Sequence, residues 1–137
     1  MDLHFVKAAP ISGMSFSASI NGHEVAMDNP ENGEPSIGPS PKRLMLGALA
    51  GCTDIDVVSI LNKMKVPFES LEISVEAGLT ENHPKIYQNV KIMYSIKLAD
   101  ADRSKMAKAV NLSMDKYCGV SAMFRGFAKL DTEILFL

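Results

Sequence analysis

The chain has 137 residues, of which 47% are hydrophobic and 22% charged, and its formal net charge is −2. This composition is typical of a globular protein and excludes a disordered chain. The length favours a single domain over residues 1–137. The 14 lysines and arginines are scattered, with neither a basic run nor interleaved aromatic residues, so we do not expect nucleic acid as a partner.

The sequence shows no targeting or membrane-spanning pattern. Residues 1–7 lack the positive stretch followed by an apolar stretch that marks a signal peptide. The longest apolar stretch, residues 44–61, is interrupted by Thr53, Asp54 and Asp56, which argues against an ordinary membrane span. We therefore expect a cytoplasmic protein without a membrane partner, whose cysteines are free thiols, transient disulfide partners or metal ligands.

The first third of the chain predicts three strands. Residues 3–7 fit a first strand that reaches a turn near Pro10. Residues 14–20 alternate apolar side chains with serines, which is the period of a half-buried strand. Asn21-Gly22 then predicts a tight hairpin, because both turn positions need positive φ. Residues 28–40 contain three prolines and no basic residue, which indicates a loop.

Residues 40–65 predict a long helix. Ser40 is a suitable N-cap and Pro41 suits the first helical position, while Pro67 follows the expected end near Lys65. Most of the circumference is apolar, with Leu46, Leu49, Thr53, Val57, Ile60 and Met64 on one face and Leu44, Gly47, Gly51, Ile55 and Val58 on another. Such a helix is buried on most sides, so we expect a sheet or a partner subunit around it.

The rest of the chain predicts a strand hairpin, a second helix and a last strand. Alternating residues 71–80 and 90–98 form the hairpin, with glutamates on one strand facing lysines on the other. The second helix starts near Asp102, and Gly119 marks its end or a kink. Residues 128–136 alternate as a strand. The order βββ-α-ββ-α-β predicts an α+β domain, and we expect its sheet to be antiparallel.

Cys52 lies within the first predicted helix, and Cys118 follows 118 − 52 = 66 residues later. On a helical wheel, the stripe that contains Cys52 is apolar before it and polar after it. A small substrate could reach a thiol at such a boundary, but free cysteine is also among the most buried residue types, so simple packing is an alternative. The charge of Asp56 would raise the pKa of this thiol, and a reactive thiolate needs a compensating cation.

A run of small residues comes just before Cys52, and Cys118 lies at the end of a predicted helix. Gly47 and Gly51 each cost about 1 kcal/mol in a helix relative to alanine, which close approach of a second helix would offset; access to the Cys52 thiol is the alternative. Cys118 lies where the second helix ends, so amides of a following helical turn would stabilise its thiolate. Packing beside Tyr117 is the alternative there.

Other chemistries have no sequence signature. His4, His23 and His83 have no metal-ligand spacing to one another or to a cysteine, so we expect no metal site. The chain also lacks a glycine-rich phosphate loop, a serine nucleophile elbow and a pair of catalytic carboxylates. We therefore expect no bound cofactor.

Two segments together resemble the OsmC/Ohr family. They are Leu49-Ala-Gly-Cys52-Thr-Asp-Ile-Asp-Val-Val-Ser-Ile-Leu61 and Asp115-Lys-Tyr-Cys118-Gly-Val-Ser121. The order of strands and helices matches over essentially the whole chain, and the residues after Cys52 are closest to the YhfA-like branch. The resemblance implies an OsmC-like fold, with strands wrapped around central helices in an intertwined homodimer and active sites at the dimer interface.

The resemblance also implies a function in oxidative stress defence, the thiol-dependent reduction of organic hydroperoxides. Cys52 would be the peroxidatic cysteine and Cys118 the resolving cysteine. An external dithiol reductant of the lipoyl type would then reset the disulfide. Peroxidases of the family use an arginine from the N-terminal strands to stabilise the thiolate, whereas the first arginine here is Arg43.

Arg43 is therefore the candidate cation that stabilises the Cys52 thiolate, with Lys42 and Arg125 as further candidates. Lysine and arginine are not equivalent in this role, because only arginine has a planar, forked guanidinium. A different function also fits the sequence, namely a non-catalytic dimer of the same fold that binds a ligand or senses oxidation. The missing N-terminal arginine motivates this alternative.

Overall fold

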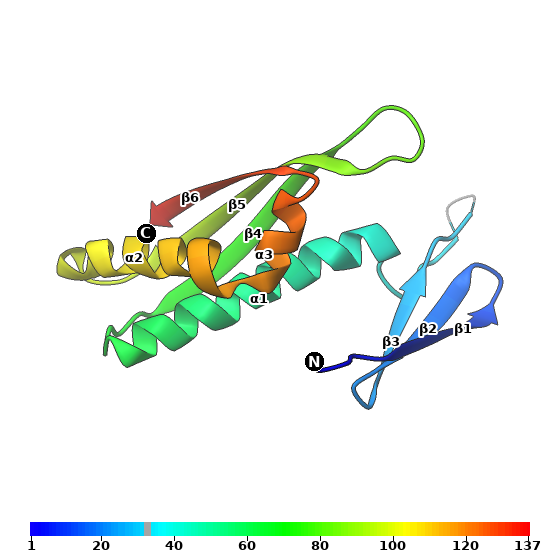
Figure 1. Ribbon diagram of the computed structural model, residues 1–137, viewed down its shortest axis with the longest axis horizontal. Coiled ribbons are helices and arrows are strands. Elements are labelled where there is room, and N and C mark those ends of the chain that lie inside the picture. Colours follow the sequence, from blue (N-terminus) through cyan, green and yellow to red (C-terminus); the bar gives the residue numbers. More distant parts are fainter. Residues whose placement is uncertain (32–33) are drawn as a thin grey trace. The chain divides into compact units, whose positions relative to one another are not determined.

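The computed structural model describes residues 1–31 and 34–137 (Figure 1). The predicted loop of residues 28–40 includes residues 32 and 33, which lie outside the described residues. The chain divides into two compact units, Met1–Met45 and Leu46–Leu137, and each is described by itself. The mixture of helices and two three-stranded sheets confirms the predicted α+β class, while the single domain over residues 1–137 stays a prediction.

The N-terminal unit is a three-stranded antiparallel sheet of β1 (Val6–Ser12), β2 (Ser15–Ile20) and β3 (His23–Asp28). Asn21 and Gly22 have φ angles of 50° and 80°, which confirms the predicted hairpin. The first strand lies later than predicted, because the chain reverses at Gly13, with φ of 53°, and not at Pro10. Pro10 is tolerated within β1 because β1 is an edge strand.

Helix α1 spans Pro41–Lys63. The Ser40 hydroxyl accepts a hydrogen bond from the backbone N–H of Arg43 at 3.4 Å, which confirms the predicted N-cap. After the helix, Lys65 adopts a φ of 57°, a left-handed conformation that cannot continue the helix. The helix therefore ends two residues before the predicted position.

Only one of the two predicted apolar faces of α1 is buried within the chain. Leu49, Thr53, Val57 and Leu61 are fully buried, at intervals of four residues. Ile55, on the other face, is 72% exposed. By length and hydropathy alone α1 would also suit a membrane span, but core helices pass the same test and α1 packs one face into the core.

The C-terminal unit contains a sheet in the order β4-β5-β6. Strands β4 (Ser70–Leu79) and β5 (Tyr87–Lys97) form the predicted antiparallel hairpin. Strand β6 (Lys129–Phe136), however, runs parallel to β5, so the prediction of an antiparallel sheet was wrong for this pair. The reason is the helical connection between them, which carries the chain back to the end of the sheet where β5 begins.

That connection is an almost continuous helical segment with one break. It consists of the short 3-10 turn η1 (Asp100–Asp102), α2 (Arg103–Leu112), the π-helical turn η2 (Ser113–Tyr117) and α3 (Gly119–Arg125). Cys118 has an extended conformation, with ψ of 98°, and separates η2 from α3. The predicted helix start near Asp102 and the break before Gly119 are both confirmed.

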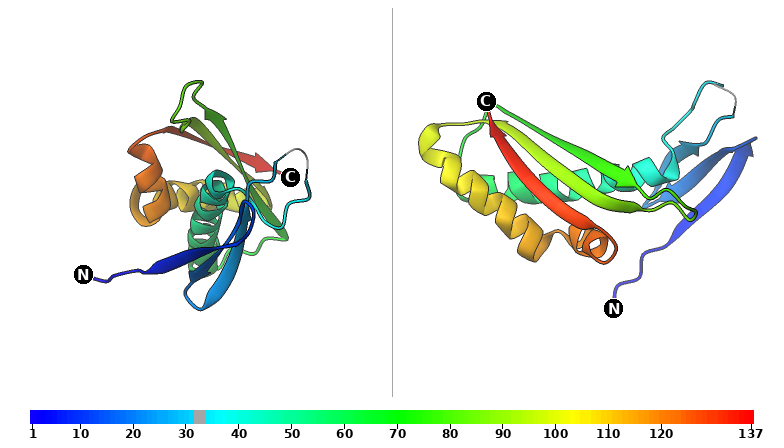
Figure 2. Two further views of the ribbon diagram at one scale, coloured as in Figure 1. Left: turned by 90° about the vertical axis from the view of Figure 1, so that its right-hand side faces the viewer. Right: turned by 90° about the horizontal axis from the view of Figure 1, so that it is seen from above.

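The core of the C-terminal unit lies between its sheet and its helices. The part of α1 from Leu46 onward and α2 lie along the same face of the sheet (Figures 1 and 2). The side chains that fill the space come from α1, β5, α2 and α3, and include Leu49, Val57, Leu61, Val90, Ile92, Ile96, Met106, Val110 and Phe124. Cys52 packs at the margin of this core, on the side of α1 that faces α3.

Candidate active site

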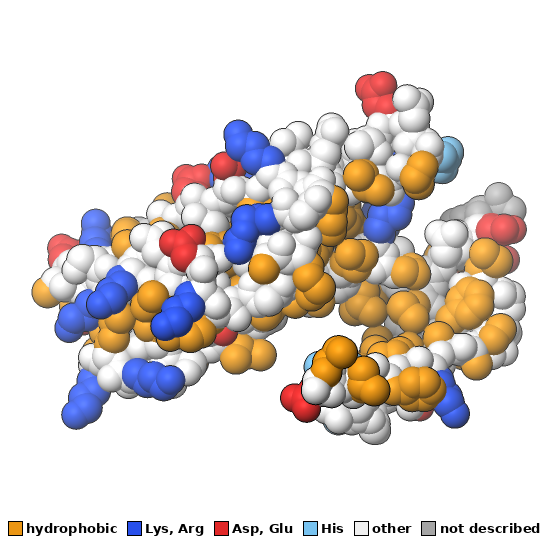
Figure 3. All heavy atoms as spheres, viewed as in Figure 1, with side chains coloured by type: hydrophobic (Ala, Val, Ile, Leu, Met, Phe, Trp, Pro, Cys, Tyr) orange, Lys and Arg blue, Asp and Glu red, His pale blue; other side chains and the backbone are white. Residues whose placement is uncertain are grey.

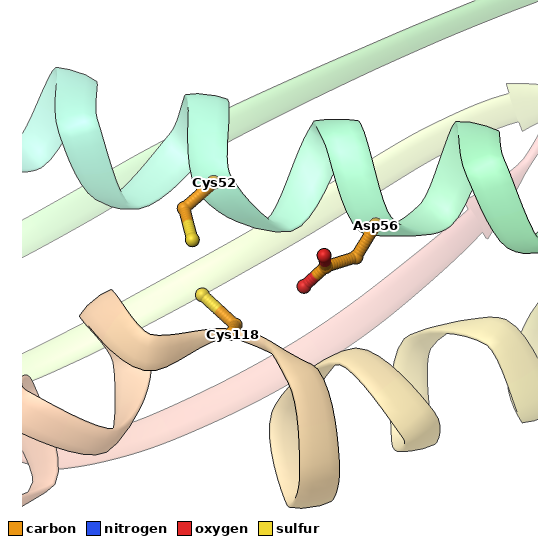
Figure 4. Close-up of side chains that lie close together, drawn as sticks. All are labelled: Cys52, Asp56 and Cys118. Atoms are coloured by element: carbon orange, nitrogen blue, oxygen red, sulfur yellow. The ribbon is translucent and has the colours of Figure 1, made fainter. Parts of the chain in front are cut away.

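The two cysteine sulfurs and one carboxylate meet between α1 and the start of α3. Cys52 Sγ, Cys118 Sγ and a carboxylate oxygen of Asp56 all lie within 4.8 Å of one another. Figure 4 shows the two sulfurs pointing toward each other, with the Asp56 carboxylate beside them. Both cysteines are free thiols, Cys52 half-buried and Cys118 buried. The structure therefore brings the predicted couple together and adds Asp56 to it.

Cys118 owes its position to the π-helical turn before it. The backbone N–H of Cys118 donates to the carbonyl of Ser113, five residues back, at 2.7 Å. Turns of this kind often occur at functional sites in helices. Cys118 then acts as the N-cap of α3, because its Sγ accepts a hydrogen bond from the backbone N–H of Ser121 at 3.3 Å. This is the amide contact that the sequence predicted.

The surroundings of Cys52 disfavour its thiolate. Burial raises the pKa of the Cys52 thiol, and the nearby Cys118 and the negative charge of Asp56 raise the pKa further. A backbone hydrogen bond from Val120 opposes these effects and lowers the pKa, but the net shift is upward. The predicted direction of the Asp56 effect is thus confirmed.

A buried chain of hydrogen bonds holds Asp56 in place. Ser113 Oγ donates to Asp56 Oδ2 at 2.9 Å, and Ser113 Oγ is in turn 2.8 Å from Thr53 Oγ1. Thr53 Oγ1 lies 2.6 Å from the hydroxyl of Tyr94. Thr53, Ser113 and Tyr94 are each fully buried. The chain therefore links β5, α1 and η2 through side-chain oxygens alone.

The ionised carboxylate fixes the direction of every bond in this chain. A carboxylate only accepts, and each hydroxyl has a single proton to donate. Since Ser113 donates to Asp56, Ser113 must accept from Thr53, and Thr53 must accept from the Tyr94 hydroxyl. All three protons therefore point toward the site, and burial raises the pKa of Tyr94 to about 12, which keeps its hydroxyl protonated as a donor.

Sequence reasoning missed Tyr94 and Ser113 as site residues. Tyr94 occupies a buried position among the apolar residues of β5, and a buried tyrosine hydroxyl needs a hydrogen-bond partner. That rule signals a polar network in the core. Tyr94 is hydrogen-bonded to Thr53 on α1, 41 residues away, and Thr53 is hydrogen-bonded to Ser113 on η2, 60 residues away. No rule based on sequence spacing identifies partners at such separations.

The predicted cations lie at two different places in the chain. Arg43 belongs to the N-terminal unit, where its guanidinium donates to Ser40 Oγ at 3.2 Å. Arg125 donates to Ser121 Oγ at 3.4 Å. The ionisable side chains that shift the pKa of Cys52 are Cys118 and Asp56, and both raise it. The role of Arg43 as the thiolate-stabilising cation stays a prediction.

A hollow of about 290 Å³ adjoins Asp56. Ile60, Met64, Leu112 and Tyr117 supply apolar surface, and Ser59 and Lys63 lie at its polar side. Asp56 is one helical turn from Cys52, so the hollow begins close to the thiol pair. Its mixed lining suits a small molecule with an apolar body and one polar end.

Comparison with known proteins places the chain in a family. The family model described as OsmC-like protein matches residues 32–133. The chain belongs to the OsmC-like family. Protein YhfA of Escherichia coli (strain K12) is 32% identical over 114 residues, which cover 82% of this chain and 83% of YhfA. The predicted family is therefore confirmed, and a curated relative carries the name of the predicted branch.

Solved structures agree with this OsmC-like fold. A hypothetical protein from Aquifex aeolicus VF5 matches with a TM-score of 0.82 and 26% identity, covering 100% of this chain and 99% of the other. An organic hydroperoxide resistance protein from Elizabethkingia anophelis matches with a TM-score of 0.71 and 14% identity, covering 99% of each chain. At that lower identity the second match supports the fold alone.

We predict that Tyr94→Phe destabilises this OsmC-like protein by about 1–2 kcal/mol at pH 7, because the buried Thr53 oxygen loses its donor. Urea unfolding under reducing conditions measures the loss. Tyr117→Phe is the matched control, since Tyr117 is 53% exposed, and its stability should stay close to wild type. Equal stability of Tyr94→Phe and Tyr117→Phe would contradict the role of the hydrogen-bond chain.

The same variant should change the response to alkaline pH. Burial raises the folded-state pKa of Tyr94 from 10.0 to about 12, so the folded state keeps a proton that the unfolded state releases. This contribution is complete below pH 10 and is lost as pH rises to about 12. The stability advantage of wild type over Tyr94→Phe should therefore shrink across that interval in urea unfolding.

We predict that Asp56→Asn speeds alkylation of Cys52 by iodoacetamide about fivefold at pH 7. Removing the negative charge lowers the pKa of Cys52 and raises its thiolate fraction; fivefold corresponds to the roughly 1 kcal/mol between unit charges about 4 Å apart in water. Mass spectrometry of the Cys52 peptide measures the rate. Asp54→Asn, which removes a carboxylate from a different side of α1, should leave the rate unchanged.

Proposed function

We propose that this protein reduces organic hydroperoxides with Cys52 and Cys118 as its redox couple. The observation that carries the proposal is the pair of free thiols within 4.8 Å of each other, although 66 residues separate them in sequence. The OsmC-like fold supports it, because the structural neighbours include proteins named for organic hydroperoxide resistance.

The unequal burial of the two thiols supports an order for their reaction in which Cys52 reacts first. The half-buried Cys52 is the more accessible of the two, so its thiolate attacks the distal oxygen of the hydroperoxide ROOH. The O–O bond breaks, the alcohol ROH leaves after taking a proton, and Cys52 becomes a sulfenic acid. The hollow beside Asp56 offers apolar surface for the R group.

Cys118 completes the couple. Its sulfur attacks the sulfenic sulfur of Cys52, which forms a disulfide and releases water. Closing the bond requires the sulfurs to approach to about 2.05 Å, a movement of less than 3 Å from their present separation. A dithiol of the lipoyl type in a reducing cytoplasm then returns both cysteines to thiols and is itself oxidised to a disulfide.

Stopped-flow mixing with cumene hydroperoxide tests this proposal. Wild type should consume the hydroperoxide repeatedly when a dithiol is supplied. Cys52→Ser should fall to the uncatalysed rate, whereas Cys118→Ser should turn over more slowly than wild type, because the external dithiol must then reach the half-buried sulfenic acid of Cys52 directly. If Cys52→Ser consumes cumene hydroperoxide as fast as wild type, the proposal fails.

A non-catalytic role in ligand binding or redox sensing is the second candidate. The raised pKa of Cys52 favours it, because burial, Cys118 and Asp56 all oppose the thiolate that fast peroxide chemistry needs. The two candidates differ in turnover. A sensor becomes oxidised once and stays so, whereas a peroxidase regains its thiols with dithiol and consumes many equivalents of hydroperoxide.

We also propose that the protein is a homodimer, as its resemblance to the family implies. The support is the uncovered face of α1. A Cβ added at Gly47 or Gly51 would meet no atom within 4 Å, and Ile55 on the same face is 72% exposed. Hydrophobic side chains also reach the surface in the space-filling view (Figure 3). A second copy would cover this face, and small residues allow close helix approach.

We predict that Ile55→Asp shifts the protein from dimer to monomer, because a charge would be desolvated within the interface. Size-exclusion chromatography with light scattering measures the mass of both forms. Ser74→Asp is the control, since Ser74 lies on the exposed face of β4, and it should remain dimeric. A wild-type protein that runs as a monomer at all concentrations would contradict the dimer.

A further inference from the structure

The two sulfurs and the carboxylate of the candidate active site are also atoms of the kinds that bind metal ions. Cys52 and Asp56 lie one turn apart on α1, and Cys118 approaches them from the N-cap of α3. Their ligand atoms lie within 4.8 Å of one another and converge on one point (Figure 4). Thiolates favour zinc and similar soft cations, while magnesium and calcium favour sets made only of oxygen ligands.

We propose that the reduced protein binds one Zn²⁺ through Cys52 Sγ, Cys118 Sγ and a carboxylate oxygen of Asp56. Zn–S bonds of about 2.3 Å and Zn–O bonds of about 2.1 Å place tetrahedral ligand atoms about 3.5–3.8 Å apart. Since the ligand atoms lie within 4.8 Å of one another, a contraction of at most about 1.3 Å reaches that geometry. Three protein ligands leave the fourth position to water, as in open zinc sites.

The surroundings of the ligands support the site independently of their spacing. Ligands in metal sites are usually oriented by hydrogen bonds from outside the site. Ser113 Oγ donates to Asp56 Oδ2, which leaves Oδ1 available for the cation. The backbone N–H of Ser121 donates to Cys118 Sγ, and Cys52 has a hydrogen bond with the backbone of Val120. All three ligands therefore have an orienting partner.

The proton balance of binding follows from the ligands. Zinc binds cysteine as thiolate, so two thiols each release a proton to solvent as the two Zn–S bonds form. No electrons are transferred. Two thiolates and one carboxylate then carry three negative charges, which the divalent cation largely offsets. Because both sulfurs are occupied, the zinc-bound form and the disulfide form exclude each other.

Titration of the reduced, full-length protein with Zn²⁺ under anaerobic conditions tests the site, with a chromophoric chelator as competitor. Wild type should bind one Zn²⁺ per chain. Cys52→Ser and Cys118→Ser should each lower the affinity at least about 100-fold, and Asp56→Asn and Ser113→Ala about 10- to 100-fold. Asp54→Asn, the matched control, should bind as wild type does. Unchanged affinity in both cysteine variants overturns the proposal.

A second measurement on wild type alone guards against variants that fail to fold. One equivalent of Zn²⁺ should slow iodoacetamide alkylation of Cys52 at least about tenfold, and EDTA should restore the rate, because the metal-bound sulfur is no longer a free nucleophile. An unchanged alkylation rate with Zn²⁺ present would contradict the zinc site. Neither experiment contains hydroperoxide, so the zinc site is tested independently of the peroxidase proposal.

Discussion

Both thiols depend on one buried chain of hydrogen bonds, from Tyr94 through Thr53 and Ser113 to Asp56. Ser113 is its junction, because its hydroxyl holds Asp56 while its carbonyl accepts the backbone N–H of Cys118. The chain thereby joins β5, α1 and η2 at the place where the two sulfurs meet. A partly satisfied buried network destabilises a core, whereas a complete one specifies its arrangement, and among the described residues no buried side-chain polar atom lacks a partner.

The same arrangement gives the site two opposing tendencies. Burial, Cys118 and Asp56 raise the pKa of Cys52 and so favour its neutral thiol. A neutral thiol is a poor nucleophile, so this slows nucleophilic chemistry. Two sulfurs and a carboxylate gathered in one place nevertheless suit either a disulfide or a divalent cation of the soft class. A cation bound there would make thiolates out of both cysteines, and an oxidant would remove them as ligands. We therefore expect the reactivity of the site to depend on whether it holds a cation.

The fold brings the sulfurs together through its crossover connection. Strand β6 lies parallel to β5, so the chain must pass back along the sheet through α2, η2 and α3. The single extended residue in that passage is Cys118, between η2 and α3. Its position opposite α1 follows from packing α1 and α2 on one face of the sheet, where Leu49, Val57 and Met106 fill the core.

The sequence by itself determined the α+β class, the capped start of α1, the Asn21-Gly22 hairpin and the family, because these depend on local periodicity, turn chemistry and two short motifs. It also named both cysteines and the direction of the Asp56 effect. Only the tertiary structure decided the parallel direction of β6, the burial of just one face of α1, and the network through Tyr94 and Ser113. The bonds of that network join residues 41 to 60 positions apart, and contacts at that separation are set by packing, which no local pattern encodes.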